Sequence, residues 1–443
     1  AKWCRCDIKS KRTMNIRMFP PEGVLEARIS LPLSKSMSAR ALIINALTSG
    51  SSPLPKVAEC DDTDAMVSAL RDDSESLHRT VNIGAAGTTM RFLTAYYACR
   101  PGCDITLDGS ERMRQRPISV LVDALRTLGA DIKYIGEEGY PPLRIRGKKL
   151  KGGELSLDSS VSSQYISALL MTAPAMTDGL KLTLLGEITS RPYILMTLRM
   201  MRDHGVESEF YLNTITIPPS TYRAPSSPRE IEGDWSAAAA WYEIEALSAG
   251  AVTIDNLVND SCQGDRCLAD IYSKIGVDTD WDGEDGGTDL LANPDADARA
   301  NIDFSDCPDL AQYVTVTCVM LGIPFNFTGL HTLAIKETDR VAALKNELTK
   351  LGIMLDDSIP GTLRWDGRRV RITEIPVFDT YNDHRMAMCL APIALYIPGI
   401  IIRDAEVVTK SYPGFWQDLS SAGFSILEAN EEEPSDSEKE GDK

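Results

Sequence analysis

The chain has 443 residues, of which 43% are hydrophobic and 25% are charged, proportions typical of ordinary soluble globular proteins. This length predicts about two or three domains with a large buried core. The formal net charge of −18 argues against general nucleic-acid binding, because a phosphate backbone would be repelled, and no run of roughly 18 apolar residues indicates a membrane span. We expect a cytoplasmic protein with neither nucleic-acid nor membrane partners.

The cysteines and histidines do not form a metal-binding pattern. The chain holds ten cysteines and four histidines, without a C-x-x-C pair. The closest cysteine spacings, Cys4 with Cys6 and Cys99 with Cys103, match no zinc motif. The expectation is free thiols in a reducing cytosol and no bound metal.

A helical pattern that ends in glycine recurs at near-equal intervals. Glycine is typical just after the last helical turn, because it adopts positive φ without strain. A weaker first member is expected around residues 65–73. The intervals between the clear members are 76, 71, 76 and 71 residues, and these members end before Gly129, Gly205, Gly276, Gly352 and Gly423.

A second helix series runs out of phase with the first and begins after Ser34-Lys35-Ser36. Its later members start at Gly87, Ser162, Asp234, Asp309 and Asn382, at intervals of 75, 72, 75 and 73 residues. Short β-prone segments separate the helices, among them 105–107, 143–146 and 370–373. The pattern predicts an α/β unit with two helices that is copied six times.

A cation lies at a nearly constant distance before the glycine that ends each of four of these helices. Arg116, Arg191, Arg340 and Lys410 lie 13, 14, 12 and 13 residues before the glycines that end their helices. If these helix starts converge, helix dipoles and fixed cations would surround one cleft. Such a cleft would suit substrates rich in phosphate and carboxylate.

Two motifs in the first hundred residues place polar groups at helix starts. Ser36 and Arg40 share one side of a first turn, and with Lys35 they offer a grip for carboxylate or phosphate. The alternative is a plain N-cap at Ser34 with cations that face solvent. Gly87 lies in a small-residue loop before a helix, where backbone N–H groups can approach an anion closely.

The middle of the chain carries three further candidates. Arg112, Arg114 and Arg116 precede a helix-starting proline, and one or two of them could instead face solvent. The Ser162-Ser163-Gln164 run offers hydroxyls and an amide for polyol oxygens, with a generous N-cap as the alternative. Ser190-Arg191-Pro192-Tyr193 is open to the same two interpretations.

Two segments near the C-terminal end combine charge with a helix start. Asp309 either complements a helix dipole or accepts a proton from a hydroxyl. Arg385 is a stronger candidate than the neighbouring His384, which suits a cap or a core position equally well. The segment 336–340 (Lys-Glu-Thr-Asp-Arg) holds four charges in five residues, so it is either a capping segment or a grip for an anion.

These motifs together resemble the enolpyruvylshikimate-phosphate synthase family over roughly residues 14–427. The resemblance implies an α/β, two-domain, inverse α/β barrel-like fold built from six βαβαββ repeats, three per domain. It implies a discontinuous first domain (14–33 plus 233–428), a second domain (34–232) and, beyond them, a disordered acidic tail (429–443). The motifs that carry it are residues 34–42, 86–91, 162–164, 336–340 and 381–388.

The resemblance also implies a reaction and its residues. The family transfers the enolpyruvyl group of phosphoenolpyruvate to the 5-hydroxyl of shikimate 3-phosphate. No cofactor is expected, and this chain is expected to act as a monomer. Asp309 would accept the hydroxyl proton, Glu337 would protonate the methylene carbon, and Lys35 would assist catalysis. Shikimate 3-phosphate would contact Lys35, Ser36, Arg40, Ser162, Ser163, Gln164, Ser190, Tyr193, Asp309 and Lys336. Phosphoenolpyruvate would contact Lys35, Gly87, Arg116, Gln164, Glu337, Arg340, Arg385 and Lys410.

Four positions depart from the family pattern, and two other functions stay open. Leu33 and Ala85 replace a usual Gly and Asn, Thr332 replaces an Asn, and Phe92 replaces a Pro. A related transferase that acts on a UDP-amino sugar is one alternative, although the loop 109–116 lacks the cysteine usual there. A catalytically inactive binding protein with the same fold is the other.

Overall fold

The computed structural model describes residues 14–48, 56–71, 78–158, 162–186, 188, 190–226, 230–283 and 286–429. The predicted acidic tail, apart from residue 429, lies outside the described residues, as do the last two residues of the weak helix expected at 65–73. In the described ranges, no helix has both the length and the apolar character needed to cross a membrane.

Five small sheets in the described part of the chain share one strand order, except that one lacks its third strand and one takes its fourth strand from the N-terminal end. The first two strands of each unit are parallel and the others join antiparallel, in the order first, second, fourth, third. The first two sheets are β3 (Arg79–Asn82), β4 (Asp104–Asp108), β6 (Leu143–Arg146), β5 (Asp131–Tyr134), and β7 (Gly153–Asp158), β8 (Leu180–Leu185), β10 (Thr214–Ile217), β9 (Glu209–Tyr211).

The remaining three sheets lie in the other half of the molecule. In the second of them, the missing third strand is replaced by isolated bridges from Ile353 to Arg369 and from Asp356 to Arg364. The three sheets are β2 (Glu26–Ile29), β11 (Ala251–Ile254), β13 (Thr288–Ala292), β12 (Val277–Asp280), then β14 (Ala300–Asp303), β15 (Phe325–Thr328), β16 (Leu363–Trp365), then β17 (Val377–Phe378), β18 (Ile400–Ile402), β1 (Ile16–Phe19), β19 (Ser425–Glu428).

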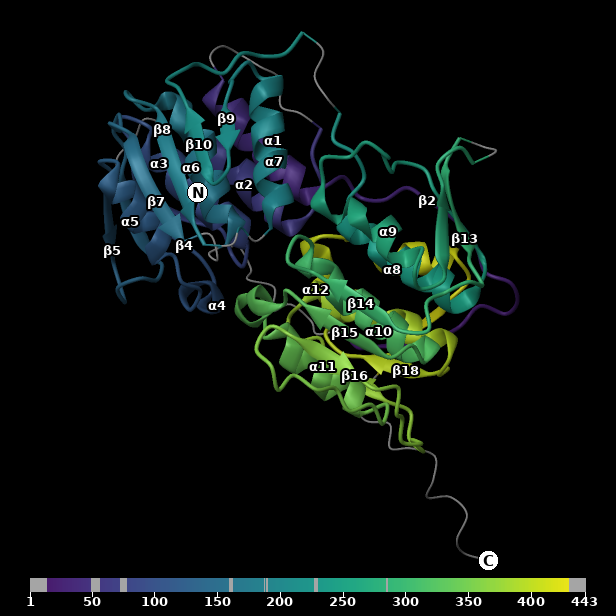
Figure 1. The fold of residues 1–443 in the computed structure, drawn as a ribbon. Helices are drawn as coiled ribbons and strands as arrows, with labels where there is room; N and C mark the ends of the chain where they lie inside the picture. Colours follow the sequence, from purple (N-terminus) through teal and green to yellow (C-terminus); the bar gives the residue numbers. More distant parts are fainter. Residues whose placement is uncertain are drawn as a thin grey trace, which may run out of the picture.

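The N-terminal segment completes two sheets of this second half. Strand β1 inserts between β18 and β19, and β2 runs parallel to β11. The two predicted domain boundaries, at residues 33/34 and 232/233, lie side by side, because Leu33 bridges to Gly233 and the Ser34 N–H donates to the Glu232 carbonyl at 2.8 Å. Figure 1 shows the purple strand β2 in the green and yellow lobe, away from the blue lobe.

Six helices start the units and are buried on nearly all sides, so they form the interior of the lobes. Eleven of the twelve residues of α3 are buried, ten of the eleven in α10 and all seven in α12. The six are α1 (Lys35–Leu47), α3 (Gly87–Ala98), α6 (Ser163–Thr172), α8 (Trp235–Ser248), α10 (Ala311–Leu321) and α12 (His384–Leu390).

A second helix follows in each unit. The predicted glycines follow five of these outer helices at φ between +71° and +119°, which confirms the five helix ends predicted from their spacing. The described residues hold five sheets, so the sixth copy, with α1 and α2, has no sheet among them. These helices are α2 (Asp61–Arg71), α5 (Ser119–Thr127), α7 (Arg191–Asp203), α9 (Leu268–Tyr272), α11 (Arg340–Thr349) and α13 (Phe415–Ser421). Short turns complete the fold: α4 (Glu111–Arg114), η1 (Ala173–Ala175), η2 (Gly264–Cys267), η3 (Pro308–Leu310), η4 (His331–Ile335), η5 (Ala391–Leu395) and η6 (Ala405–Lys410).

The apolar core is divided between the two lobes of Figure 1. One cluster runs from Met37 to Ile231, and the other joins residues 16–31 to residues 235–424. One strand prediction is wrong, because residues 370–373 form no ladder. Val370 donates to the Gly352 carbonyl at 2.8 Å, but the segment otherwise lies at the surface without a partner strand.

Gly352→Ala should destabilise the fold more than Gly205→Ala. Both sites have similar φ, but a Cβ has room at Gly205 and none at Gly352. Gly352 (φ +71°) has no room for a Cβ, which would collide with the Val370 carbonyl, whereas a Cβ on Gly205 (φ +79°) meets nothing nearer than 4.0 Å. Urea unfolding should show a loss of about 1 kcal/mol for Gly205→Ala and about 3 kcal/mol for Gly352→Ala. Equal losses would contradict this account of the helix ends.

Candidate functional site

The N-termini of all six inner helices border one cavity between the two lobes. The cavity wall includes Lys35 of α1, Gly87 of α3, Ser163 of α6, Ser236 of α8, Asp309 just before α10 and His384 of α12. Unpaired N–H groups and the helix dipole make each of these ends favourable for negative charge. The predicted convergence concerned the glycine-capped helices, and of their four cations Arg116 and Arg340 line this cavity whereas Arg191 and Lys410 do not.

Arg40 supplies a buried cation whose partners in the described residues are neutral. Its Nε donates to the Thr197 hydroxyl at 2.7 Å and its Nη2 to the Ser167 hydroxyl at 3.0 Å. The rings of Phe92 and Tyr193 lie 5.4 and 6.0 Å from the guanidinium. Burial lowers the pKa of Arg40 to about 10, so it stays charged at neutral pH and can compensate an anion.

Gly87 and Arg116 are packed directly against each other. A Cβ at Gly87 would lie 2.6 Å from the Arg116 Nη1, so only glycine allows this contact. Arg91 fixes the arrangement, because its Nη1 donates to the Gly87 carbonyl at 3.1 Å and its Nη2 to the Pro117 carbonyl at 3.2 Å. Burial and the Arg116 charge lower the pKa of Arg91 to about 10. The pair concentrates positive charge at the start of α3.

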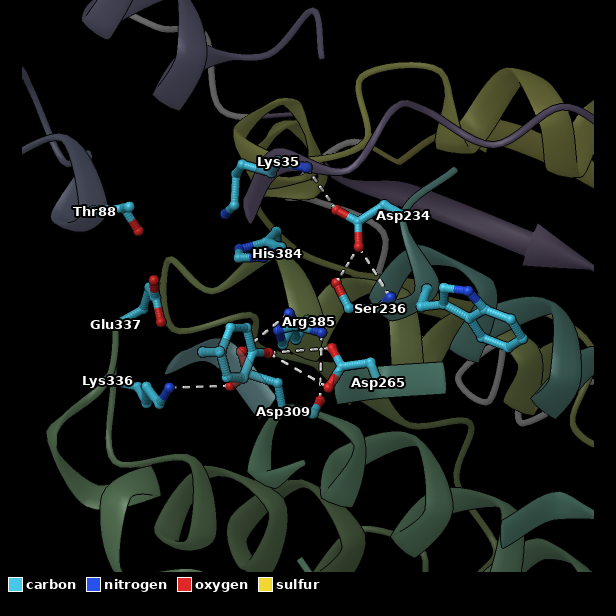
Figure 2. A network of polar contacts seen from close by, with 12 residues as sticks. Lys35, Thr88, Asp234, Ser236, Asp265, Asp309, Lys336, Glu337, His384 and Arg385 are labelled. Carbon is cyan, nitrogen blue, oxygen red and sulfur yellow. Dashed lines mark hydrogen bonds and ion pairs between the residues drawn. The ribbon is translucent and has the colours of Figure 1, made fainter. Parts of the chain in front are cut away.

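Lys35 is held by two carboxylates that come from different lobes. Its Nζ lies 3.3 Å from Asp62 of α2, and its backbone N–H donates to Asp234, the N-cap of α8, at 3.1 Å. Asp234 also accepts from the Ser236 N–H and hydroxyl at 3.0 and 2.7 Å, as Figure 2 shows. Burial acts to lower the pKa of Lys35, but Asp62 and other negative groups outweigh it and the pKa is raised.

Arg340, the first residue of α11, joins three carboxylates in the interior. It is 1% exposed and contacts Asp383 at 2.7 Å, Asp309 at 2.7 Å and Glu337 at 2.8 Å. Burial acts to lower the pKa of Arg340, but the three carboxylates raise it above its ordinary value. Asp339 caps the helix by accepting from the Ala342 N–H at 3.1 Å, so the segment 336–340 is both a cap and part of the cavity.

Asp309 is surrounded by cations. Its carboxylate lies 3.2 Å from Lys336, 2.7 Å from Arg340 and 3.2 Å from Arg385, and Figure 2 shows Lys336 and Arg385 directed toward it. Burial acts to raise the pKa of Asp309, but these cations hold it well below its usual range. The carboxylate is therefore ionised, as an acceptor of protons must be.

Glu337 is in a similar position. One oxygen lies 3.0 Å from Lys410 and the other 2.8 Å from Arg340, and these cations together with Arg116 outweigh burial, so the pKa of Glu337 lies well below normal. Lys410, at the end of η6, reaches the site through this contact. The other residues assigned to the two substrates line the cavity itself, whereas the further candidates Arg112, Arg114 and Arg191 do not.

The hydroxyl and amide groups of Ser162, Ser163, Gln164 and Ser190 lie on the blue lobe side. Ser162 caps α6 by accepting from the Gln164 N–H at 3.3 Å, and the Gln164 amide donates to Thr88 at 3.1 Å. Ser190 is in the left-handed region (φ +53°), immediately before α7. Thr332, one of the departures from the family pattern, lines the cavity with a buried hydroxyl that has no hydrogen-bond partner.

The sequence reasoning missed several acids that hold these cations in place. Asp62, Asp234 and Asp383 each pair with a predicted site residue, and their first-turn or N-cap positions were the available signal. Asp265 gave no such signal. It is 4% exposed and accepts from the Tyr193 hydroxyl at 3.4 Å, and burial together with the Asp309 charge raises its pKa to about 7. Within the described ranges, no group of three or more His, Cys, Asp or Glu is arranged to hold a metal ion.

Comparison with known proteins gives a consistent picture. Residues 20–72 and 73–419 match the family model described as EPSP synthase (3-phosphoshikimate 1-carboxyvinyltransferase). Curated relatives named 3-phosphoshikimate 1-carboxyvinyltransferase include one from Bacteroides fragilis, 49% identical over 404 residues (91% of this chain, 96% of the relative). Another, from Haemophilus influenzae, is 36% identical over 434 residues (90% and 97%). An EPSP synthase structure from Acinetobacter baumannii superposes with a TM-score of 0.73 at 21% identity, covering 94% of this chain and 100% of that one, which confirms the predicted two-domain α/β fold.

Arg340→Met should destabilise the protein by about 3–5 kcal/mol, because it leaves the fully buried Asp383 carboxylate without its cation. Adding Asp383→Asn should recover part of that loss. Denaturant unfolding of the two variants measures both effects. The exposed Arg368→Met is the control and should change stability by less than about 0.5 kcal/mol. A double variant no more stable than Arg340→Met would contradict the proposed compensation.

Asp265→Asn should stabilise the protein above pH 7 by roughly 1–3 kcal/mol and have little effect near pH 4. The pKa of Asp265 is raised from 3.8 to about 7 on folding, so the unfolded chain loses this proton at lower pH. The free energy of unfolding of the unaltered protein therefore decreases between pH 4 and pH 7. Asp265→Asn lacks the titrating group, so its free energy of unfolding should not show this decrease. Unfolding at both pH values, with exposed Asp260→Asn as control, measures the difference. A variant equally stable with the unaltered protein at both pH values would rule out this burial penalty.

Proposed function

The chain belongs to the EPSP synthase (3-phosphoshikimate 1-carboxyvinyltransferase) family of transferases, and on that premise we propose how its cavity works. The reaction transfers the enolpyruvyl group of phosphoenolpyruvate to the 5-hydroxyl of shikimate 3-phosphate and releases phosphate. It belongs to the shikimate pathway of aromatic amino-acid biosynthesis. The observation that carries the assignment of residues is the cavity at which six helix N-termini and cations of both lobes meet.

Shikimate 3-phosphate is assigned to the side of the cavity that begins at α1, α6 and α7. Arg40 supports this, since its partners among the described residues are neutral and a phosphate group would compensate its charge. Lys336 would add a second cation. Hydroxyl and amide groups would hold the polyol ring. The proposed contacts are Lys35, Ser36, Arg40, Ser162, Ser163, Gln164, Ser190, Tyr193, Asp309 and Lys336.

Phosphoenolpyruvate is assigned to the cations around Glu337. The contact between Gly87 and Arg116 supports this, because the missing side chain lets the guanidinium lie directly beside the backbone at the start of α3, where a phosphate could contact both. Arg340, Arg385 and Lys410 would compensate the carboxylate and the departing phosphate. The proposed contacts are Lys35, Gly87, Arg116, Gln164, Glu337, Arg340, Arg385 and Lys410.

The chemistry requires one base and one acid. Asp309 takes the proton of the 5-hydroxyl as that oxygen bonds to the central carbon of phosphoenolpyruvate. Glu337 gives a proton to the methylene carbon, which becomes a methyl group in the tetrahedral intermediate. Glu337, left ionised by that transfer, then takes back one methyl proton as the bond from the central carbon to the phosphate oxygen breaks, which restores the double bond and releases phosphate. Cations around the cavity stabilise the charge that develops on the phosphate, with Lys35 among them.

Ligand binding prepares Glu337 for its role as an acid. In the free protein Lys410, Arg340 and Arg116 lower its pKa. Negative ligand groups compete for these cations, so the pKa of Glu337 rises on binding and it can carry a proton. The same exchange at Lys336 and Arg385 raises the pKa of Asp309 and makes it a better base.

We propose that the chain acts as a cytoplasmic monomer and that residues 14–33 plus 233–428 form one domain and residues 34–232 the other. The two apolar clusters support this division. The roles assigned above need no metal or organic cofactor.

Phosphate release from phosphoenolpyruvate should require shikimate 3-phosphate. Asp309→Ala and Glu337→Gln should each lower kcat by at least about 100-fold, since general acid–base groups contribute on that scale. Glu154→Gln, an exposed acid paired with Lys181, is the control and should keep normal turnover. Release that depends on UDP-N-acetylglucosamine instead would favour the alternative transferase. Normal turnover in both site variants would refute the acid–base assignment.

A further inference from the structure

Two hydrogen bonds cross from one lobe to the other beside Glu337. The Nε of Arg112, on α4 of the blue lobe, donates to the Glu337 carbonyl at 3.2 Å. The Thr409 hydroxyl, on η6 of the other lobe, lies 3.0 Å from both the Asp61 carboxylate of α2 and the Glu406 carbonyl of its own lobe, and its proton is shared between these two acceptors. No role has been assigned above to either donor.

Both bonds act on the same ion pair. Arg112 holds the main chain of Glu337, whereas Thr409 is the residue next to Lys410, whose Nζ lies 3.0 Å from the Glu337 carboxylate. Asp61 in turn precedes Asp62, the partner of Lys35. The Glu337–Lys410 pair is therefore fastened to the opposite lobe on both of its sides.

The segment that carries Glu337 needs such support. Residues 336–338 lie between η4 and α11 and belong to neither a helix nor a strand. The Glu337 carboxylate is held by Arg340 and Lys410 of its own lobe, so these contacts would persist if the lobes moved apart. The bond from Arg112 to its main chain would not.

We infer that Arg112 and Thr409 are positioning residues that set Glu337 and Lys410 against the substrate bound by the opposite lobe. Proton transfer to the methylene carbon then depends on contact between the lobes. This inference rests on the proposed role of Glu337 as proton donor. Neither residue touches the reacting atoms.

The helix α4 provides a matched control. Arg114 is also exposed, two residues from Arg112, but it pairs with Asp108 of its own lobe at 2.6 Å. The control for Thr409 is Thr349, whose hydroxyl donates to the Lys345 carbonyl within one helix. Substitution of these controls removes the same chemical groups without removing a bond between lobes.

The test compares the steady-state kinetics of Arg112→Ala with those of Arg114→Ala. Arg112→Ala should lower kcat about 10-fold, the effect of losing one hydrogen bond from a charged donor, while KM for both substrates changes less. The solvent deuterium isotope effect on kcat should rise, because proton transfer becomes slower. Arg112→Lys should recover much of the rate. Thr409→Val should lower kcat roughly 3- to 10-fold, with Thr349→Val unaffected.

The outcomes separate this inference from the proposed function. If the unaltered chain does not turn over the two substrates, the function assigned above fails and the inference fails with it. If the unaltered chain is active but Arg112→Ala matches Arg114→Ala in kcat and isotope effect, only the positioning role is overturned. An equal loss in both arginine variants would point to α4 as a whole and would also overturn it.

Discussion

The burial of six helix N-termini around one cavity is the constraint on which the rest of the structure depends. Each inner helix is enclosed by its own lobe, so its first N–H groups can be satisfied only by caps, by the opposite lobe or by a bound anion. Ser34, Ser162, Asp234 and Asp383 cap four of these helices. The remaining ends face the cavity, where phosphate and carboxylate groups would complete them.

The cations of the cavity are held in place by acids before any ligand arrives. Arg340 binds three carboxylates and Lys35 binds Asp62. Asp309 and Glu337 make three further ion pairs, with Lys336, Arg385 and Lys410. This arrangement allows a chain of strongly negative net charge to maintain a local positive site. The proposed acid, Glu337, and the proposed base, Asp309, are themselves ion-pair partners of these cations. Their pKa values therefore change when a negative ligand competes for the same cations.

Much of the fold and of the site could be predicted because both repeat along the chain. The spacing of the glycines predicted the ends of the outer helices. The polar residues at the starts of the inner helices predicted the cavity wall, since the first turn of each inner helix borders the same cavity. Strands β1 and β2 pair with strands that lie hundreds of residues later in the chain. No local sequence pattern indicates such long-range pairing. Asp265 was missed for a similar reason, because only tertiary packing buries it beside Tyr193.

The central claim is that ligand charge displaces Glu337 from its cations and raises its pKa. Calorimetric titration with shikimate 3-phosphate and inorganic phosphate, in two buffers of different ionisation enthalpy near pH 6, counts the protons taken up. The comparison with Glu337→Gln cancels the ionisation of the ligands themselves. The account predicts greater proton uptake by the unaltered protein than by the variant. Equal uptake, or greater uptake by the variant, would contradict it.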